Sequence, residues 1–460
     1  MLKKYALGIL VLAILSASSI GGMNVKRAND EFEKNSSFNG NVAITDQFFD
    51  SMIKGLMKIG HMSSISAAIV NGNEIKWVKG YGIYNREKGF TSDENTVYLV
   101  ASISKTITAT AIMQLQEKGL LNIDDDVNKY LPFSLRNPNY PDIPITIRML
   151  LSHTSSLNED PITFYAYIPG DPEIEGYPYP WLKDYLTPNG RIYIPQVWGD
   201  YPPGEKMKYA NVGYGILGYV VERVSGMPFE EYCRKNIFEP LQMYNSSFYL
   251  SSFDTNRVAV PYTIYRGEYY PFLHYGILVY PAGGLRTTVI DLSHFLMAHM
   301  NGGVWNGVRI LSERSVEEMH SIQAYSSYGF DYGLGWQIWQ KGGGLQIGHT
   351  GGLYGVSTEM AFREDGCGII FFTDKEIKNI REMIVFSLLE RLLFWKANNY
   401  KMDELSRGKI LETIKGNIHL LNDKNVGEEE INFYVDGVMK SLLTFALYHD
   451  TISSTVFSKS

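Results

Sequence analysis

The chain has 460 residues, of which 45% are hydrophobic and 20% are charged, and its formal net charge is −7. This composition is typical of a globular protein, and the length exceeds what one compact core usually needs. No block of basic residues is present to neutralise phosphates, so the charge argues against nucleic acid as a partner.

The first 22 residues have the pattern of a secretory signal peptide. Lys3 and Lys4 precede an apolar run, Tyr5 to Leu15, and the small-residue stretch SASSIGG follows. We therefore expect an extracytoplasmic protein, either secreted or anchored at the outer face of the cell membrane. An uncleaved N-terminal segment would provide that membrane association. Residues 23–43 are polar and predict a flexible leader.

Cysteine and histidine usage gives no sign of a metal centre. Cys233 and Cys367 are the only cysteines, which allows one bridge but no disulfide scaffold. No CxxC or HExxH pattern occurs, and the nine histidines lack ligand spacing. The sequence therefore predicts neither a metal nor a cofactor.

The first predicted elements are a helix, a hairpin and a second helix. Apolar residues recur at helical spacing over 44–57. Two β-rich runs over 64–85 are joined by Asn71-Gly72-Asn73, a hairpin signal. The next helix carries Ser102 at its front and is capped by Gly119.

A mostly helical middle follows, and β-rich runs with glycine turns return from Trp336. A long apolar-periodic helix then covers 376–396. The simplest arrangement is α/β, or more narrowly α+β: an antiparallel sheet built from both ends of the chain, flanked by helices, with an inserted all-helical domain. We assign 44–397 to this domain and 398–460 to a small helical C-terminal extension.

Ser102 and Lys105 form an S-x-x-K pattern, which by itself arises easily by chance. Residues three apart share one helix face, so both side chains can point into one cleft. A serine hydroxyl needs a nearby base or a favourable field to become a nucleophile. Burial would make the neutral amine of Lys105 accessible, whereas a charged Lys105 would stabilise nearby negative charge.

A second pattern, Tyr209-Ala210-Asn211, precedes another apolar-periodic helix. A phenol near a lysine ammonium ionises more easily and can serve as a general base. The alternative for Tyr209 is a structural, hydrogen-bonding phenol. The amide of Asn211 can bind a substrate carbonyl and also accept from a lysine.

A third pattern, His349-Thr350-Gly351-Gly352, lies on a predicted edge strand. Glycines let a substrate carbonyl approach a backbone N–H closely. The N–H groups of Ser102 and Gly352 could together form an oxyanion hole.

The segments SISK, YAN and HTG, in this order, resemble the three motifs of the serine β-lactamase-like superfamily. The likeness is to the branch of class C β-lactamases, D-aminopeptidases and esterases, which includes penicillin-binding-protein-like hydrolases. The segments RMLLSHTSSL, YPAGGLRTTVIDLSHFLMAHMNGG and YGLGWQI are also similar to that family, so the resemblance covers about residues 45–395. It implies a sandwich of antiparallel sheet and helices with an all-helical domain.

The resemblance also implies roles for individual residues. Ser102 would be the acylated nucleophile, Lys105 its proton partner, and Tyr209 the base for the serine and later for water. The residues expected to contact the substrate are Asn211, His349, Gly351 and Gly352.

His349 departs from the family pattern, because many members carry a lysine at this place. A histidine is mostly neutral at neutral pH, so we expect weaker demand for the carboxylate of penicillins. Peptidase or esterase activity is then favoured over efficient antibiotic hydrolysis. The alternative is a strand histidine with a structural partner, and we likewise expect His153 to be buried and hydrogen-bonded. No S-D-N element occurs, which fits the tyrosine branch.

A further departure is an insertion over 158–201, rich in proline, glycine and aromatic rings. It could border the cleft as a lid or substrate wall, or be a proline-stiffened surface loop.

The leading hypothesis is a secreted serine hydrolase that cleaves amide or ester bonds of a small-molecule or peptide substrate through an acyl-enzyme. The alternatives are a penicillin-binding sensor or ligand-binding protein with weak or no turnover, and a transpeptidase.

Overall fold

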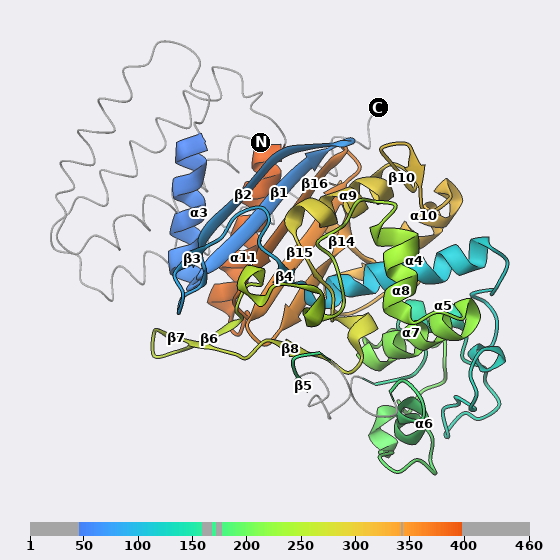
Figure 1. Cartoon of the computed structure of the whole chain (residues 1–460). Coiled ribbons are helices and arrows are strands. Elements are labelled where there is room, and N and C mark those ends of the chain that lie inside the picture. Colours follow the sequence, from blue (N-terminus) through green and yellow to red (C-terminus); the bar gives the residue numbers. More distant parts are fainter. Residues whose placement is uncertain (1–45, 159–167, 172–176, 342–343, 398–460) are drawn as a thin grey trace, which may run out of the picture. The chain divides into compact units, whose positions relative to one another are not determined.

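The computed structural model describes residues 46–158, 168–171, 177–341 and 344–397 (Figure 1). The predicted signal peptide, leader and C-terminal extension lie outside the described residues. The chain divides into two compact units, and residues 61–340 and 344–379 form the larger one. Among the described helices, none is long and apolar enough to cross a membrane.

The described part of the smaller unit consists mainly of two helices that contact each other, α3 (Asp46–Gly60) and α11 (Ile380–Ala397). Lys396 Nζ donates to Asp46 Oδ1 at 2.7 Å and lies 4.5 Å from the centre of the Phe49 ring. Both predicted terminal helices are therefore confirmed, with the second beginning four residues later than expected.

An eight-stranded sheet, in the order β12-β13-β14-β15-β16-β1-β2-β3, is the main β structure (Figure 1). Strands from the two ends of the chain pair directly, with Ile65 of β1 opposite Thr373 of β16 in antiparallel register. The predicted antiparallel sheet is thus confirmed. Its strands are β1 (Ser64–Asn71), β2 (Glu74–Asn85), β3 (Phe90–Thr91), β12 (Asp331–Tyr332), β13 (Gln337–Lys341), β14 (Gly344–Leu353), β15 (Val356–Arg363) and β16 (Cys367–Thr373).

The central strands are buried along their whole length. Every residue of β16 and all but the last of β1 are buried, so both segments are apolar without strict alternation. Helix α9 (Val289–Met300) contacts β1, β2, β15 and β16. The predicted hairpin turn after β1 is confirmed, and Gly72 has a φ of +59°, which favours glycine.

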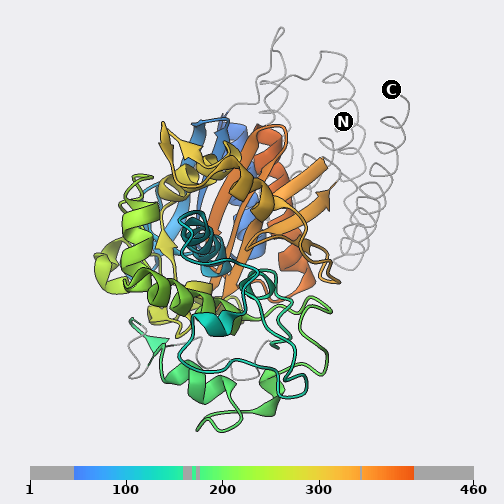
Figure 2. The same cartoon turned by 90° about the vertical axis from the view of Figure 1, so that its right-hand side faces the viewer.

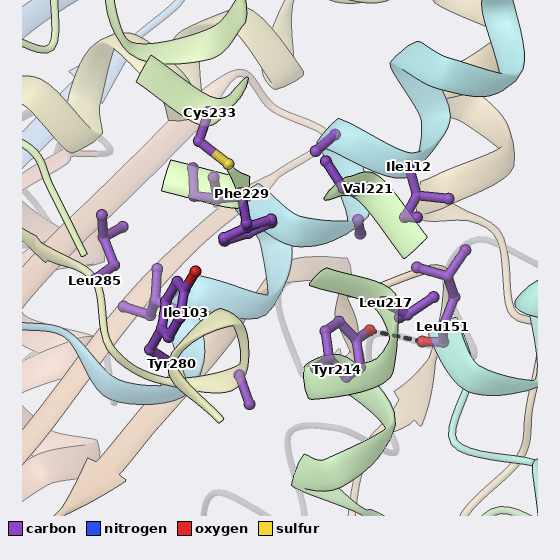
Figure 3. Packing of buried hydrophobic residues seen from close by; sticks show 14 of the residues in the cluster. Ile103, Ile112, Leu151, Tyr214, Leu217, Val221, Phe229, Cys233, Tyr280 and Leu285 are labelled. Carbon is purple, nitrogen blue, oxygen red and sulfur yellow. Dashed lines mark hydrogen bonds between the residues drawn. The ribbon is translucent and has the colours of Figure 1, made fainter. Parts of the chain in front are cut away.

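The helical part of the larger unit is built around α4 (Ser104–Glu117) and α7 (Asn211–Ser225), which contact each other (Figure 2). The α7 helix also contacts α5 and α8. In the core between them, Tyr214 Oη donates to the Leu151 carbonyl at 2.7 Å (Figure 3). The other helices of this part are α5 (Ile147–Leu151), α6 (Trp181–Leu186), α8 (Phe229–Cys233) and α10 (Glu313–His320).

Short two-stranded ladders complete the larger unit. Strand β4 (Tyr98–Leu99), just before the Ser102 turn, pairs with β9 (Arg286–Thr287). The other short strands are β5 (Ile168–Pro169), β6 (Tyr262–Tyr265), β7 (Glu268–Pro271), β8 (Tyr275–Gly276), β10 (Val304–Trp305) and β11 (Val308–Arg309).

The described part of the insertion packs into the protein core. Strand β5 pairs with β8, and the side chains of Leu182, Tyr185 and Trp198 are buried. The described part of the insertion is therefore more than a surface loop, because its side chains are buried in the core of the protein. Cys233 and Cys367 are both buried and free, so the one possible bridge does not form.

Candidate active site

Ser102 lies in a 3-10 turn, Ala101–Ile103, that precedes α4. The predicted continuous helix is therefore split, and α4 itself begins at Ser104. Ala101 has a φ of +50°, a left-handed conformation that residues with a side chain rarely adopt. This turn buries Ala101 and Ile103 and leaves Ser102 partly exposed.

Lys105 is completely buried and points at Ser102. Its Nζ lies 3.0 Å from Ser102 Oγ, 2.7 Å from Asn211 Oδ1 and 2.6 Å from the Ala282 carbonyl oxygen. The amide and carbonyl oxygens can only accept, so they take two N–H donors. The third position of the nitrogen, a proton or a lone pair, faces the serine hydroxyl. This geometry suits proton transfer between the two side chains.

Tyr209 lines the same cleft as Ser102, and Lys105 Nζ lies 4.9 Å from the centre of the Tyr209 ring. The structure thus brings together two sequence patterns, Ser102–Lys105 and Tyr209-Ala210-Asn211, although Lys105 and Tyr209 are 104 positions apart in the chain. A cation over an aromatic face is stabilised by the ring electrons. The geometry places the phenol beside both members of the S-x-x-K pair.

The His153 ring packs against the Tyr209 ring. The two ring centres are 4.3 Å apart, and His153 Nδ1 accepts from the backbone N–H of Ala210 at 3.2 Å. Burial first, then the charge of Lys105, holds the pKa of His153 well below its usual range. The ring is therefore neutral and its Nε2 has no partner. The expectation of a buried, hydrogen-bonded histidine is confirmed.

Strand β14 lies between β13 and β15, so the prediction that the HTG pattern lies on an edge strand is wrong. The two glycines of β14 have different surroundings. A Cβ on Gly351 would lie 2.3 Å from the Val100 carbonyl oxygen and 2.2 Å from Thr358 Oγ1, so only glycine lets β14 approach the Ser102 turn. A Cβ on Gly352 would meet nothing within 4 Å. Gly352 and Ser102 both line the cleft, as an oxyanion hole built from their N–H groups requires.

His349 is completely buried and does not line the cleft. Its Nδ1 lies 2.6 Å from the Thr350 carbonyl oxygen and must donate to it, so Nε2 accepts from Tyr332 Oη at 2.8 Å. Burial first, then Lys105, lowers the pKa of His349 to about 3. The geometry favours the alternative of a neutral histidine with a structural partner, and direct contact with a substrate stays a prediction.

The cleft has a volume of about 370 Å³ and none of its lining side chains carries a formal charge. Three of its residues had no role in the sequence analysis: Tyr328, Phe330 and Gln337. The sequence analysis noted the neighbouring segment YGLGWQI as similar to the family, but it assigned no role to the glutamine in that segment. No described residue of the insertion lines the cleft, so a role as substrate wall stays a prediction. The lining residues are Ser102, Tyr209, Tyr328, Phe330, Gln337, Thr350 and Gly352.

The residues that the structure describes include no group of three or more histidine, cysteine or carboxylate side chains able to hold a metal ion.

Comparison with known sequences identifies related proteins. A sequence model of the family described as Beta-lactamase matches residues 49–382. The putative penicillin-binding protein PbpX of Bacillus subtilis strain 168 is 30% identical over 269 residues, which are 58% of this chain and 61% of that protein. Protein flp of Staphylococcus aureus strain MW2 is 27% identical over 266 residues, 56% of this chain and 49% of that protein. The chain thus spans about half to three fifths of the length of these relatives.

Solved structures agree with this assignment. The octameric penicillin-binding protein homologue from Pyrococcus abyssi has a TM-score of 0.60 at 27% identity, covering 75% of this chain and 76% of that one. The D-amino acid amidase from Ochrobactrum anthropi SV3, complexed with L-phenylalanine amide, shares the fold with a TM-score of 0.61 at 20% identity, covering 76% and 99% of the two chains. The α/β fold expected from the sequence is confirmed, and the chain belongs to the Beta-lactamase family of serine hydrolases.

Proposed function

We propose that the protein hydrolyses amide or ester bonds of small, uncharged substrates through an acyl-enzyme on Ser102. The observation that carries this proposal is the 3.0 Å approach of Lys105 Nζ to Ser102 Oγ, with the other two positions of the nitrogen held by acceptors. A buried amine fixed in this way accepts the serine proton without first having to reorient.

The reaction has two stages. In the first, Ser102 Oγ bonds to the substrate carbonyl carbon, its proton passes to Lys105 or Tyr209, and the C–N or C–O bond breaks as the leaving group takes up that proton. In the second, a water gives a proton to the same base and attacks the acyl carbon, which releases the acid and restores the serine. The N–H groups of Ser102 and Gly352 would stabilise the oxyanion in both stages.

The uncharged cleft supports an amidase or esterase over a β-lactamase. Penicillins carry a carboxylate, yet no lining side chain is cationic and the buried His349 is neutral. The D-amino acid amidase that shares this fold is described with an amide ligand that lacks a carboxylate, which adds support for substrates without that group.

An active-site-directed fluorophosphonate tests the acyl-enzyme. We expect the purified protein to gain the mass of one label and to turn over p-nitrophenyl esters or N-acetylated amino-acid amides. Ser102→Ala should lose both properties, with the rate falling by at least about 1,000-fold. The exposed Ser134→Ala is the matched control and should keep both. Labelling without any turnover would instead indicate a ligand-binding or sensor protein, and penicillin turnover equal to the best ester would contradict the substrate class.

We also propose that residues 1–22 direct the protein out of the cytoplasm, because they combine two lysines, an apolar run and small residues. Fractionation of expressing cells, with N-terminal sequencing of the mature protein, tests this. Protein found in the cytoplasm with residues 1–22 intact would contradict the proposal.

A further inference from the structure

Gln337, the first residue of β13, occupies a distinctive place in the cleft. Only 4% of the residue is exposed, yet it is one of the residues that line the cavity. Its side-chain oxygen, Oε1, lies 2.8 Å from the backbone nitrogen of Thr350 and 3.0 Å from Thr350 Oγ1. The glutamine is therefore fixed to the strand that carries Gly352.

These contacts determine which end of the amide is the oxygen. The backbone N–H of Thr350 can only donate, so the atom facing it must be the acceptor Oε1 and not the NH2 group. Within the described residues, Nε2 makes no hydrogen bond, while Gln337 as a whole lines the cavity. The cleft thus contains an oriented N–H donor that carries no charge.

The rest of the cleft wall is apolar on this side. The Tyr328 and Phe330 rings stack with their centres 6.0 Å apart and an interplanar angle of 19°. Both rings line the cavity together with Gln337. A ligand that fills the cleft covers this donor and removes it from water. A covered donor beside apolar rings is costly to leave unpaired, so such a ligand needs an acceptor at this point.

Resting on the proposed acyl-enzyme function, we propose that Gln337 is a substrate-recognition residue whose Nε2 donates to an uncharged carbonyl oxygen beside the scissile bond. The substrate class is therefore an acyl compound with a neighbouring carboxamide or ester carbonyl and an apolar or aromatic group. A carboxylate at the same point would be desolvated without a cation to neutralise it, which disfavours it.

Gln337→Glu is a nearly isosteric test of this role. One carboxylate oxygen can keep the bond to the Thr350 N–H, while the other replaces the donor with an acceptor. The variant should lose its preference for substrates that bear the extra carbonyl. Gln116→Glu is the matched control, because Gln116 Oε1 likewise accepts a backbone N–H, from Ile123 at 3.0 Å, but lies outside the cleft.

The experiment uses three phenylacetyl thioesters whose leaving thiols are N,N-dimethylthioglycolamide, thioglycolate and propanethiol, with thiol release followed by Ellman's reagent. The dimethylamide offers a carbonyl acceptor and no N–H donor that the new carboxylate could bind. The quantity compared is the ratio of kcat/KM for the carboxamide to kcat/KM for the propyl compound, wild type against variant, so that the intrinsic reactivities of the thiols cancel. We expect this ratio to fall at least about tenfold in Gln337→Glu and to stay within twofold in Gln116→Glu, since a missing hydrogen-bond partner changes discrimination by this order. An unchanged ratio in Gln337→Glu would overturn the assignment.

A measurement on the wild type protects the test against a variant that fails to fold. Boronic acids form a reversible adduct with a reactive serine, and 3-carbamoylphenyl-, 3-carboxyphenyl- and phenylboronic acid differ only at the acceptor. We expect the carbamoyl compound to inhibit at least about fivefold more tightly than the other two. Equal inhibition by all three compounds would overturn the role of Gln337. If no thioester is hydrolysed and no boronic acid inhibits, the proposed hydrolase function itself is contradicted.

Discussion

The position of a single buried nitrogen, Lys105 Nζ, determines the chemistry of the cleft. Its acceptors come from three distant parts of the chain: Ser102, Asn211 and Ala282. The sequence predicted the first two, because a spacing of three on a helix and the YAN pattern are local signals. It could not predict the Ala282 carbonyl, since a backbone oxygen carries no residue type to recognise.

The supporting role of His153 also depends on tertiary packing. We expect His153→Phe to keep a ring against Tyr209 but to leave the backbone N–H of Ala210 without its acceptor. The free energy of unfolding should fall by roughly 1–3 kcal/mol, as for a buried N–H left unpaired. Ester kcat/KM should fall about tenfold, because a small displacement of a catalytic group is enough to cause such a loss.

The control for this variant is His294→Phe. His294 Nδ1 contacts the Leu241 carbonyl at 3.0 Å and its ring stacks on Trp305, away from the cleft-lining residues. Urea unfolding and ester kinetics of both variants separate stability from positioning. If both lose stability but keep the wild-type kcat/KM, His153 does not position Tyr209.

Among the elements, β14 has the tightest geometric requirement, because it runs against the turn that carries the nucleophile. Gly351→Ala should lower the free energy of unfolding by roughly 2–4 kcal/mol, since its Cβ would overlap a backbone carbonyl and the Thr358 hydroxyl. Gly352→Ala, one residue away with open space around it, should change stability by less than about 1 kcal/mol. Equal losses in the two variants, measured by urea unfolding, would contradict the close approach.

The end of β16 contains a carboxyl group in an unusual environment. Asp374 Oδ1 accepts from the backbone N–H groups of Ser63 and Ser64 at 3.0 and 2.9 Å, while Oδ2 is buried without a partner. Burial raises the pKa of Asp374 to about 7. An unfolded aspartate has a pKa of about 3.9, so between pH 4 and 7 only the folded state holds this proton. Its contribution to stability is therefore lost as the pH rises through this window.

We expect Asp374→Asn to stabilise the protein at high pH, because an amide oxygen can accept the same two bonds without a buried charge. At pH 8 its free energy of unfolding should exceed the wild-type value by roughly 2–4 kcal/mol, and at pH 4 the gain should vanish. Urea unfolding of both proteins at the two pH values measures the difference. A gain of the same size at both values would exclude titration of Asp374 as its cause.

At the scale of the element, the sequence predicted both terminal helices, the hairpin and the pairing of distant strands. These elements could be predicted because apolar periodicity and glycine turns are local features of the sequence. The split at Ser104 was missed because a left-handed alanine at position 101 is imposed by packing and not by its own preference. The cleft residues Tyr328, Phe330 and Gln337 were missed for the same reason, since no local pattern distinguishes them from core residues.

For the whole molecule, buried histidines determine the response to acid. His153, His299 and His349 are each at most 2% exposed, and burial holds the pKa of each well below its usual range, to about 3 for His349. The unfolded chain binds protons at these sites below about pH 6.5, whereas the folded state does not. The contribution of these histidines to stability therefore falls as the pH drops from about 6.5 toward 4.

We expect the Asp374→Asn variant to show this acid effect more clearly, without the opposing contribution of the Asp374 carboxyl group. Its urea midpoint should decrease steadily from pH 6.5 to 4, with an uptake of up to about six protons on unfolding, because burial also lowers the pKa of His274, His294 and His320. Calorimetry in buffers of different ionisation enthalpy measures that uptake directly. A midpoint that is constant over this range would contradict the lowered pKa values of these histidines.

The pairing of β1 with β16 has a consequence for how the protein is made. Contacts such as the one from Ser63 to Asp374 join residues 311 positions apart. While the chain is being synthesised, the β1 edge of its first hairpin therefore stays unpaired until β16 has been made. Premature termination anywhere before β16 would leave β1 with an exposed apolar edge, a template for aggregation, and folding should be slow because its central strand pair is the last to become possible.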